Sequence, residues 1–162
     1  MPDAGLPPER PAQDEVALGP MAESLGFLLR LAQIDAFAAW FDALGDEGMR
    51  PGEVSALMLI GLNPGVRQGV LARHLRIKRA HMAKMARAFE EAGLIRREVP
   101  EDDRRANALS LTAEGRARMD ALGPLAEAHE AQPAPNLTSR EEAELKRLLR
   151  KTLDLNAPEE GR

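Results

Sequence analysis

The chain has 162 residues, of which 44% are hydrophobic and only 3% aromatic, and its formal net charge is -4. A chain of this size fits one domain, whose core must rely on Leu, Ala, Met, Ile and Val. The absence of cysteine excludes disulfides, thiolate metal ligands and thiol-based peroxide sensing.

The first twenty residues are rich in proline and poor in large apolar side chains, so we expect residues 1–20 to form a flexible arm. No apolar run approaches the length of a membrane span, and no signal peptide is evident. We therefore expect a cytoplasmic protein without a membrane partner.

Residues 21–44 are predicted to form a helix that holds four of the five aromatic side chains. One face carries Phe27, Arg30, Ile34, Phe37 and Phe41, and another carries Leu and Ala. Two apolar faces require two partners. A guanidinium among aromatic rings needs an anion. Arg30 is therefore expected either to pair with a carboxylate of another helix or subunit, or to anchor the carboxylate or phosphate of a small effector.

A second, short apolar helix is predicted over residues 53–61, with Pro51 near its start and Asn63-Pro64-Gly65 as the turn that ends it. Met58 lies within this helix. A lone methionine there is compatible with an ordinary core position and with contact to an effector.

The next segment, Val66 to Phe89, contains seven Lys or Arg and no Asp or Glu, although the whole chain is acidic. Its apolar spacing predicts a short helix through Leu71 and Leu75, a break at residues 76–77, and a second helix. That second helix should bury Met82, Met85, Ala86 and Phe89 and turn Ala80, Lys84 and Arg87 outward, with His81 on the flank. Lys78 and Arg79 begin it where a capping side chain would be usual, so its free amides suit a phosphate.

Gly93 is expected to end the second helix of the basic segment. Two short strands should follow at residues 95–99 and 108–111, with Ile95 and Val99 on one side of the first and Leu109 and Leu111 on one side of the second. The charged tip between them, residues 100–107, is long for an ordinary hairpin and is predicted to be a wing.

Two further helices are predicted after the wing. Thr112 caps the first, which Pro124 should kink or end. Thr138 and Glu141 form a capping box that opens the last helix, whose Leu145, Leu148, Leu149 and Leu153 recur at helical spacing. The basic residues of this helix are interpreted as a solvated face.

The run LARHLRIKRAHMAKMARAFEEAGLIRR, the DRR at residues 103–105 and the LTAEGR at residues 111–116 resemble the MarR family of bacterial transcription regulators. The resemblance implies a mainly α fold with a small β wing, a winged helix-turn-helix lobe over residues 51–111, and N- and C-terminal dimerisation helices over residues 21–50 and 112–156. It also implies a homodimer whose recognition helices read an inverted repeat of double-stranded DNA, while Arg105, steadied by Asp103, enters the minor groove.

By that resemblance, the residues expected at DNA are Arg67, Gln68, Lys78, Arg79, Ala80, His81, Lys84, Arg87, Asp103, Arg104 and Arg105. Those expected near a small organic anionic effector, an aromatic acid or an acyl- or aryl-CoA, are Phe27, Arg30, Phe37, Trp40, Phe41 and Met58. The resemblance favours a repressor that the effector releases.

Enzyme chemistry finds little support, because the three histidines have no metal-ligand spacing and no nucleophile motif or phosphate loop occurs. We expect no catalytic residue, cofactor or metal site. The alternative to a DNA-binding regulator is a winged helix that binds another protein. The acid-free basic segment favours DNA, because a protein-binding platform has no need to exclude every carboxylate.

Overall fold

The structure, a computed structural model, describes residues 16–44, 49–100, 107–130 and 136–155, with only the backbone given for residues 41–44, 125, 126 and 128–130. The chain divides into two compact units, Met1–Ala39 and Trp40–Arg162. The expected arm lies largely outside the described residues.

The N-terminal unit contains the 3-10 helix η1 (Gly19–Glu23) and most of α1 (Leu25–Leu44). The α-helix was expected to start at Met21, but it starts at Leu25, because Ser24 breaks the run and its Oγ accepts a hydrogen bond from the Phe27 amide at 3.5 Å. In the single chain the apolar side chains of α1 are largely exposed: Leu25, Leu28, Leu29, Leu31, Ile34 and Phe37.

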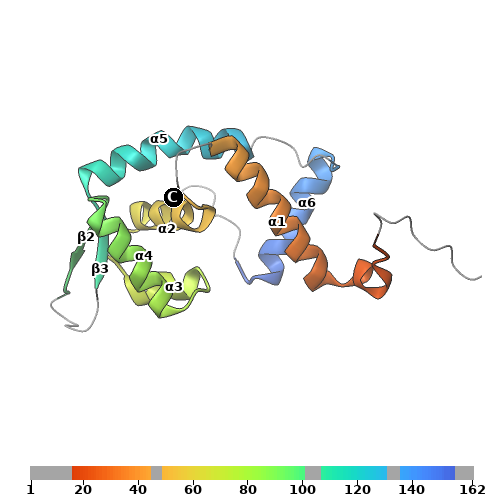
Figure 1. The fold of residues 1–162 in the computed structure, drawn as a ribbon, viewed down its shortest axis with the longest axis horizontal. Coiled ribbons are helices and arrows are strands. Elements are labelled where there is room, and N and C mark those ends of the chain that lie inside the picture. Colours follow the sequence, from red (N-terminus) through yellow and green to blue (C-terminus); the bar gives the residue numbers. More distant parts are fainter. Residues whose placement is uncertain (1–15, 45–48, 101–106, 131–135, 156–162) are drawn as a thin grey trace, which may run out of the picture. The chain divides into compact units, whose positions relative to one another are not determined.

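The second unit holds the winged part of the chain (Figure 1). Its elements in order are α2 (Pro51–Leu62), β1 (Val66–Arg67), α3 (Gln68–His74), α4 (Arg79–Glu91), β2 (Ile95–Glu98), β3 (Ala108–Leu111), α5 (Ala113–Glu130) and α6 (Ser139–Thr152). The expected helix starts and stops are mostly confirmed, with Pro51 in the first turn of α2 and Gly93 at φ 71° after α4. Pro124 does not end its helix, since α5 continues to Glu130.

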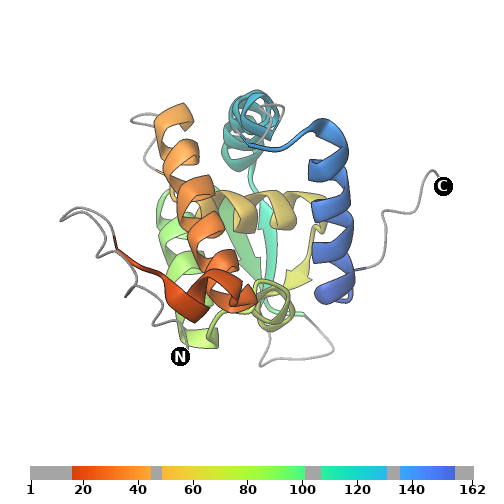
Figure 2. The same ribbon diagram turned by 90° about the vertical axis from the view of Figure 1, so that its right-hand side faces the viewer.

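Three strands, rather than the two expected, form an antiparallel sheet in the order β1-β3-β2 (Figure 2). In β2 and β3, Ile95 pairs with Leu111 and Arg97 with Leu109. The additional strand β1 pairs Val66 with Leu109 on the other edge of β3. Val99 lies beyond the end of β2 and is 60% exposed, so its expected place beside Ile95 was wrong.

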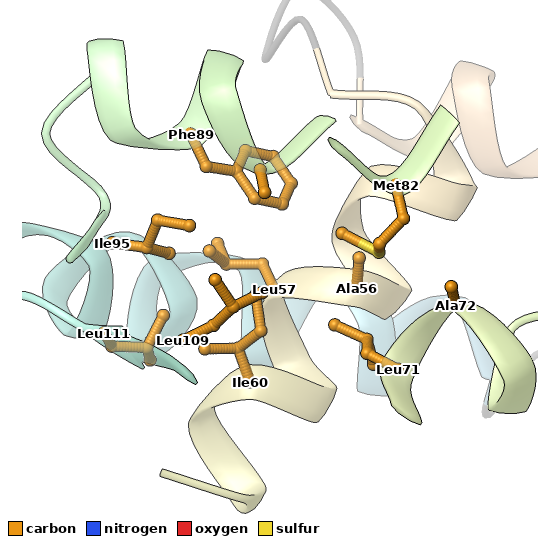
Figure 3. Packing of buried hydrophobic residues seen from close by; sticks show 11 residues of the cluster. Ala56, Leu57, Ile60, Leu71, Ala72, Met82, Phe89, Ile95, Leu109 and Leu111 are labelled. Atoms are coloured by element: carbon orange, nitrogen blue, oxygen red, sulfur yellow. The ribbon is translucent and has the colours of Figure 1, made fainter. Parts of the chain in front are cut away.

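The core of this unit lies where α2, α3, α4 and the sheet meet (Figure 3). Leu57 and Ile60 of α2 are fully buried and pack with Met82 and Phe89 of α4 and Leu109 of β3. The spacing i, i+3, i+4, i+7 correctly placed Met82, Ala86 and Phe89 inside, whereas the fourth predicted residue, Met85, is half-buried against the core. Buried apolar side chains therefore fix the position of α4 from its inner side and leave its outer side free for function.

Two glycines allow α5 to approach its neighbours closely. A Cβ atom on Gly115 would lie 1.8 Å from the carbonyl oxygen of Leu94, and one on Gly61 of α2 would lie 2.5 Å from the sulfur of Met119. Thr112 caps α5 as expected, because its Oγ1 accepts the Gly115 amide at 3.0 Å. Because Gly115 lies against the backbone of Leu94, the start of α5 packs directly on the connection between α4 and β2.

Helix α6 starts with the expected capping box, in which Thr138 Oγ1 accepts the Glu141 amide and Glu141 accepts the Thr138 amide at 2.8 Å. Leu145 and Leu148 of this helix and Leu153 at its C-cap are 39–44% exposed in the single chain. Within the described ranges, none of the helices is long and apolar enough to span a bilayer.

Candidate nucleic-acid interface

The turn between α3 and α4 is held by backbone hydrogen bonds and one left-handed residue. Leu75 caps α3, Arg76 adopts φ 54°, and the Ile77 amide donates to the Ala72 carbonyl at 3.0 Å. A positive φ at a residue other than glycine is uncommon and bends the chain sharply. This bend directs the start of α4 away from α3, as the expected helix-turn-helix requires.

The outer face of α4 is cationic along most of its length. Ala80, His81, Lys84 and Arg87 are exposed, while Met82, Ala86 and Phe89 are buried on the opposite side. The predicted partition of this helix is therefore confirmed. A helix with long donors and one small residue on its free side has the shape and chemistry to enter a major groove.

The first turn of α4 lacks a side-chain cap. Lys78 is the N-cap residue, its side chain makes no capping hydrogen bond, and the first turn contains no acidic residue. The exposed amides and the positive end of the helix dipole therefore coincide with the side chains of Lys78 and Arg79. An anion placed over this turn would gain amide hydrogen bonds and two nearby cations.

Arg87 is exposed but already has an ionic partner on the same helix. Its Nε donates to Glu91 Oε1 at 2.8 Å, four residues further along α4. The hydrogen bond and the charge of Glu91 raise the pKa of Arg87. A phosphate that binds Arg87 must therefore compete with this carboxylate.

Another ion pair, between Glu90 and Arg97, joins α4 to the sheet. Glu90 Oε2 accepts a hydrogen bond from Arg97 Nε at 2.8 Å and a second one from Nη2 of the same guanidinium. The hydrogen bonds from Arg97 lower the pKa of Glu90, and the carboxylate raises the pKa of Arg97. On the opposite face of β2, Arg96 pairs with Glu98 at 2.8 Å.

Two of the remaining residues expected at DNA lie where β1 meets the start of α3. Arg67 is exposed at the N-cap of α3. Gln68 is half-buried, and its side-chain oxygen accepts no hydrogen bond from the described residues. Asp103, Arg104 and Arg105 lie outside the described residues, so their roles remain predictions.

The residues expected near an effector are divided between the two units. In the first, Phe27 is half-buried, whereas Arg30 and Phe37 are exposed. In the second, Trp40 packs with the cluster of Val54 and Leu122, and Met58 is 36% exposed. The side chain of Phe41 is outside the described part, and the effector site as a whole stays a prediction.

Across the described stretches, no three His, Cys, Asp or Glu side chains gather into a group that could hold a metal ion.

Sequence reasoning did not identify Glu90 and Arg97 as partners, although a signal was present. Gly93 separates a helix that ends near Glu90 from a strand that starts at Ile95, and Arg97 shares the strand face of the buried Ile95. A half-buried cation on a strand face that packs on a helix is stabilised by an acid of that helix. Glu90 and Glu91 were the nearest candidates.

The three-helix arrangement of α2, α3 and α4, followed by the β2–β3 hairpin against β1, defines a winged helix-turn-helix. Residues 49–106 match the sequence model of the MarR family. This match covers α2 to β2, and together with the relatives below it supports a transcription regulator of the MarR kind.

A curated relative, the transcriptional regulatory protein for the hcr operon of Thauera aromatica, is 38% identical over 102 residues. The match covers 62% of this chain and 61% of that protein. Among solved structures, the transcriptional repressor CouR bound to a 23-mer DNA duplex matches with a TM-score of 0.75 and 28% identity, over 87% of this chain and 99% of that one. Rv2887 from Mycobacterium tuberculosis, in complex with p-aminosalicylic acid, matches with a TM-score of 0.62 and 28% identity, over 80% and 98%.

Proposed function

We propose that the chain is a cytoplasmic, homodimeric transcription regulator, without enzyme activity, that binds an inverted repeat in double-stranded DNA and represses transcription until a small organic anion releases it. The observation that carries the proposal is the exposed face of α4, which combines Lys84, His81 and Arg87 with the uncapped, cationic turn at Lys78 and Arg79. Both features match a polyanion whose phosphates flank a groove.

The exposed apolar surface of α1 and α6 supports the homodimer. A monomer rarely leaves a row of leucines in water, and on α6 Leu145, Leu148 and Leu153 recur on one side of a helix whose other side is charged. A two-fold pair would place two copies of α4 about 34 to 36 Å apart, which is one turn of DNA. The likeness to a repressor solved on a 23-mer duplex supports the same arrangement.

Arg30 supports an anionic effector. It lies among the aromatic side chains of α1 and its guanidinium is exposed, so it is accessible to a carboxylate or a phosphate. The likeness to a protein solved with p-aminosalicylic acid favours an aromatic acid, and an aromatic or acyl-CoA thioester offers similar chemistry. By differential affinity for two dimer states, such a ligand would weaken DNA binding.

A salt titration tests the DNA-binding part of the proposal. The dimer is titrated with a duplex recovered by selection from a random-sequence pool. If it makes about eight phosphate contacts, log K falls against log salt with a slope near -7. A matched pair of variants locates the contacts: Arg79→Gln removes a first-turn cation of α4, and Arg140→Gln removes an exposed first-turn cation of α6.

We expect Arg79→Gln to reduce the magnitude of the slope by about 2 per dimer, and Arg140→Gln to leave it unchanged. A flat salt response of the wild-type protein, or failure to select any duplex, would instead support the protein-binding winged helix. Equal effects of the two variants would contradict the assignment of α4 as the recognition helix.

A further inference from the structure

Arg97 belongs to β2, the strand that leads into the wing, but its side chain lies on the inner face of the sheet. Successive residues of a strand point to opposite faces, and in β2 the buried Ile95 marks the face that packs on α4. Arg97 shares that face, and its side chain is 28% exposed, against 58% for Arg96 on the other face. The position of Arg97 therefore differs from that of a cation that reaches out to a nucleic acid.

Glu90 holds this guanidinium from the last turn of α4. One carboxylate oxygen accepts both Nε and Nη2 of Arg97, so the pair is fixed in direction as well as in distance. Its members are less exposed than those of the other pairs nearby, which raises the strength of the interaction. Neither Glu91 nor Glu98 bridges two elements: Glu91 pairs within α4, and Glu98 within β2.

The pair adds a second attachment between β2 and the recognition helix. The first is the backbone connection, in which the Gly93 amide donates to Glu90 O at 2.9 Å and the Leu94 amide to Phe89 O at 2.8 Å. It holds the beginning of β2 only. Arg97 is the third of the four residues of β2, so its bond to Glu90 attaches the half of the strand that leads into the wing tip.

We infer that the Glu90–Arg97 pair positions the wing, by fixing the outer half of β2 to the recognition helix, and that Arg97 is a positioning residue and does not itself contact DNA. This inference rests on the proposed DNA-binding function. It assigns a role to Glu90, at the end of α4: to keep the wing and the recognition helix in the relative position in which both bind the same duplex.

The test compares Glu90→Gln with Glu98→Gln by the salt titration described above. Both variants remove one carboxylate that pairs with an arginine of β2, so their general effect on the electrostatic field is matched. If Arg97 positions the wing, Glu90→Gln weakens binding on the order of tenfold and lowers the salt slope by about 2 per dimer, because one wing contact per subunit is lost. Glu98→Gln then leaves the slope unchanged.

A charge exchange tests whether the pair acts on DNA binding. The readout is the salt slope, which would not change if the pair only stabilised the fold. The double variant Glu90→Arg with Arg97→Glu restores the pair in reverse and is expected to recover the wild-type slope. If Arg97 contacts DNA directly, Glu90→Gln instead tightens binding with a steeper slope, the exchange abolishes the gain, and the inference is overturned. Identical slopes for Glu90→Gln and Glu98→Gln also overturn it. Absence of any salt-dependent binding by the wild-type protein refutes the proposed function itself, which separates the two failures.

Discussion

Replacement of Gly115 by alanine is expected to destabilise the second unit, which contains the winged helix-turn-helix, strongly. The new Cβ would lie 1.8 Å from the oxygen of Leu94, 2.8 Å from its carbonyl carbon and 3.2 Å from its Cα, all of which are backbone atoms. A carbon and a carbonyl oxygen need more than about 3 Å, so α5 and Leu94 must separate by more than about 1 Å.

That separation also affects a hydrogen bond. The same Leu94 oxygen accepts the Thr112 amide at 3.0 Å, and the neighbouring Gly93 oxygen accepts Thr112 Oγ1 at 2.5 Å. Overpacking costs about 1–3 kcal/mol, and a lost hydrogen bond adds about 1 kcal/mol. We therefore expect a loss of about 2–4 kcal/mol in the free energy of unfolding. For a chain of this length, this corresponds to a fall of roughly 5–15 °C in Tm.

The assay is thermal and urea unfolding followed by circular dichroism, at one fixed protein concentration, because association changes the apparent Tm. Gly52→Ala in α2 is the control, since its Cβ would meet nothing within 4 Å and its φ is not positive. The control should have a Tm equal to that of the wild-type protein or slightly higher. A Gly115→Ala protein that melts within about 2 °C of the control would refute the close approach of α5 to Leu94.

Three further outcomes are expected. Glu91→Gln frees Arg87 from its carboxylate, so DNA affinity should rise and the salt slope should steepen in a filter-binding titration; an unchanged slope would argue that Arg87 does not meet phosphate. Because Arg97 lowers the pKa of Glu90 in the folded state, the stability contributed by Glu90 is present above its unfolded pKa and is lost as the pH falls through the lower folded value. Urea midpoints measured between pH 3 and 6 should therefore fall less steeply with acid in Glu90→Gln than in the wild type, and parallel curves would exclude this contribution. Arg30→Ala should keep its affinity for DNA but no longer be released by an aromatic acid in a thermal-shift and binding screen, whereas a variant that simply unfolds would support a structural ion pair.

The helices of the winged unit could be predicted because their apolar periodicity agrees with the capping and turn residues at their ends. Met82 and Phe89 recur at helical spacing, and Gly93 lies just after the last turn of α4. Thr112 and Thr138 are capping residues whose bonds the structure contains. At these positions, local preference and tertiary packing favour the same conformation.

The strand β1 could not be predicted, because a two-residue strand has no periodicity. Val66 and Arg67 follow an Asn-Pro-Gly turn and become a strand only because β3 offers them an unpaired edge. The Gly65 amide, which donates to Leu109 O at 2.9 Å, starts that pairing. Such a strand is specified by a partner more than forty residues away.

At the candidate DNA interface, the sequence predicted which side chains are exposed better than it predicted which ion pairs they form. The outward direction of Lys84 and Arg87 follows from an angle of 100° per residue, which the sequence determines. The ion pairs of Arg87 and Arg97 depend on which of several nearby acids each guanidinium reaches. That choice depends on rotamers and strand direction, and the spacing of charges alone does not specify it.

The left-handed turn residue Arg76 has a consequence for protein engineering. A side chain at φ 54° costs about 1–2 kcal/mol relative to glycine, yet Nη2 of this arginine donates to the Leu153 carbonyl at the end of α6 at 3.3 Å. Glycine at this position would relax the backbone and at the same time detach the turn from the last helix. An Arg76→Gly variant would thus have a less strained turn but would lose the hydrogen bond to the end of α6. Its melting temperature alone would not separate these two effects.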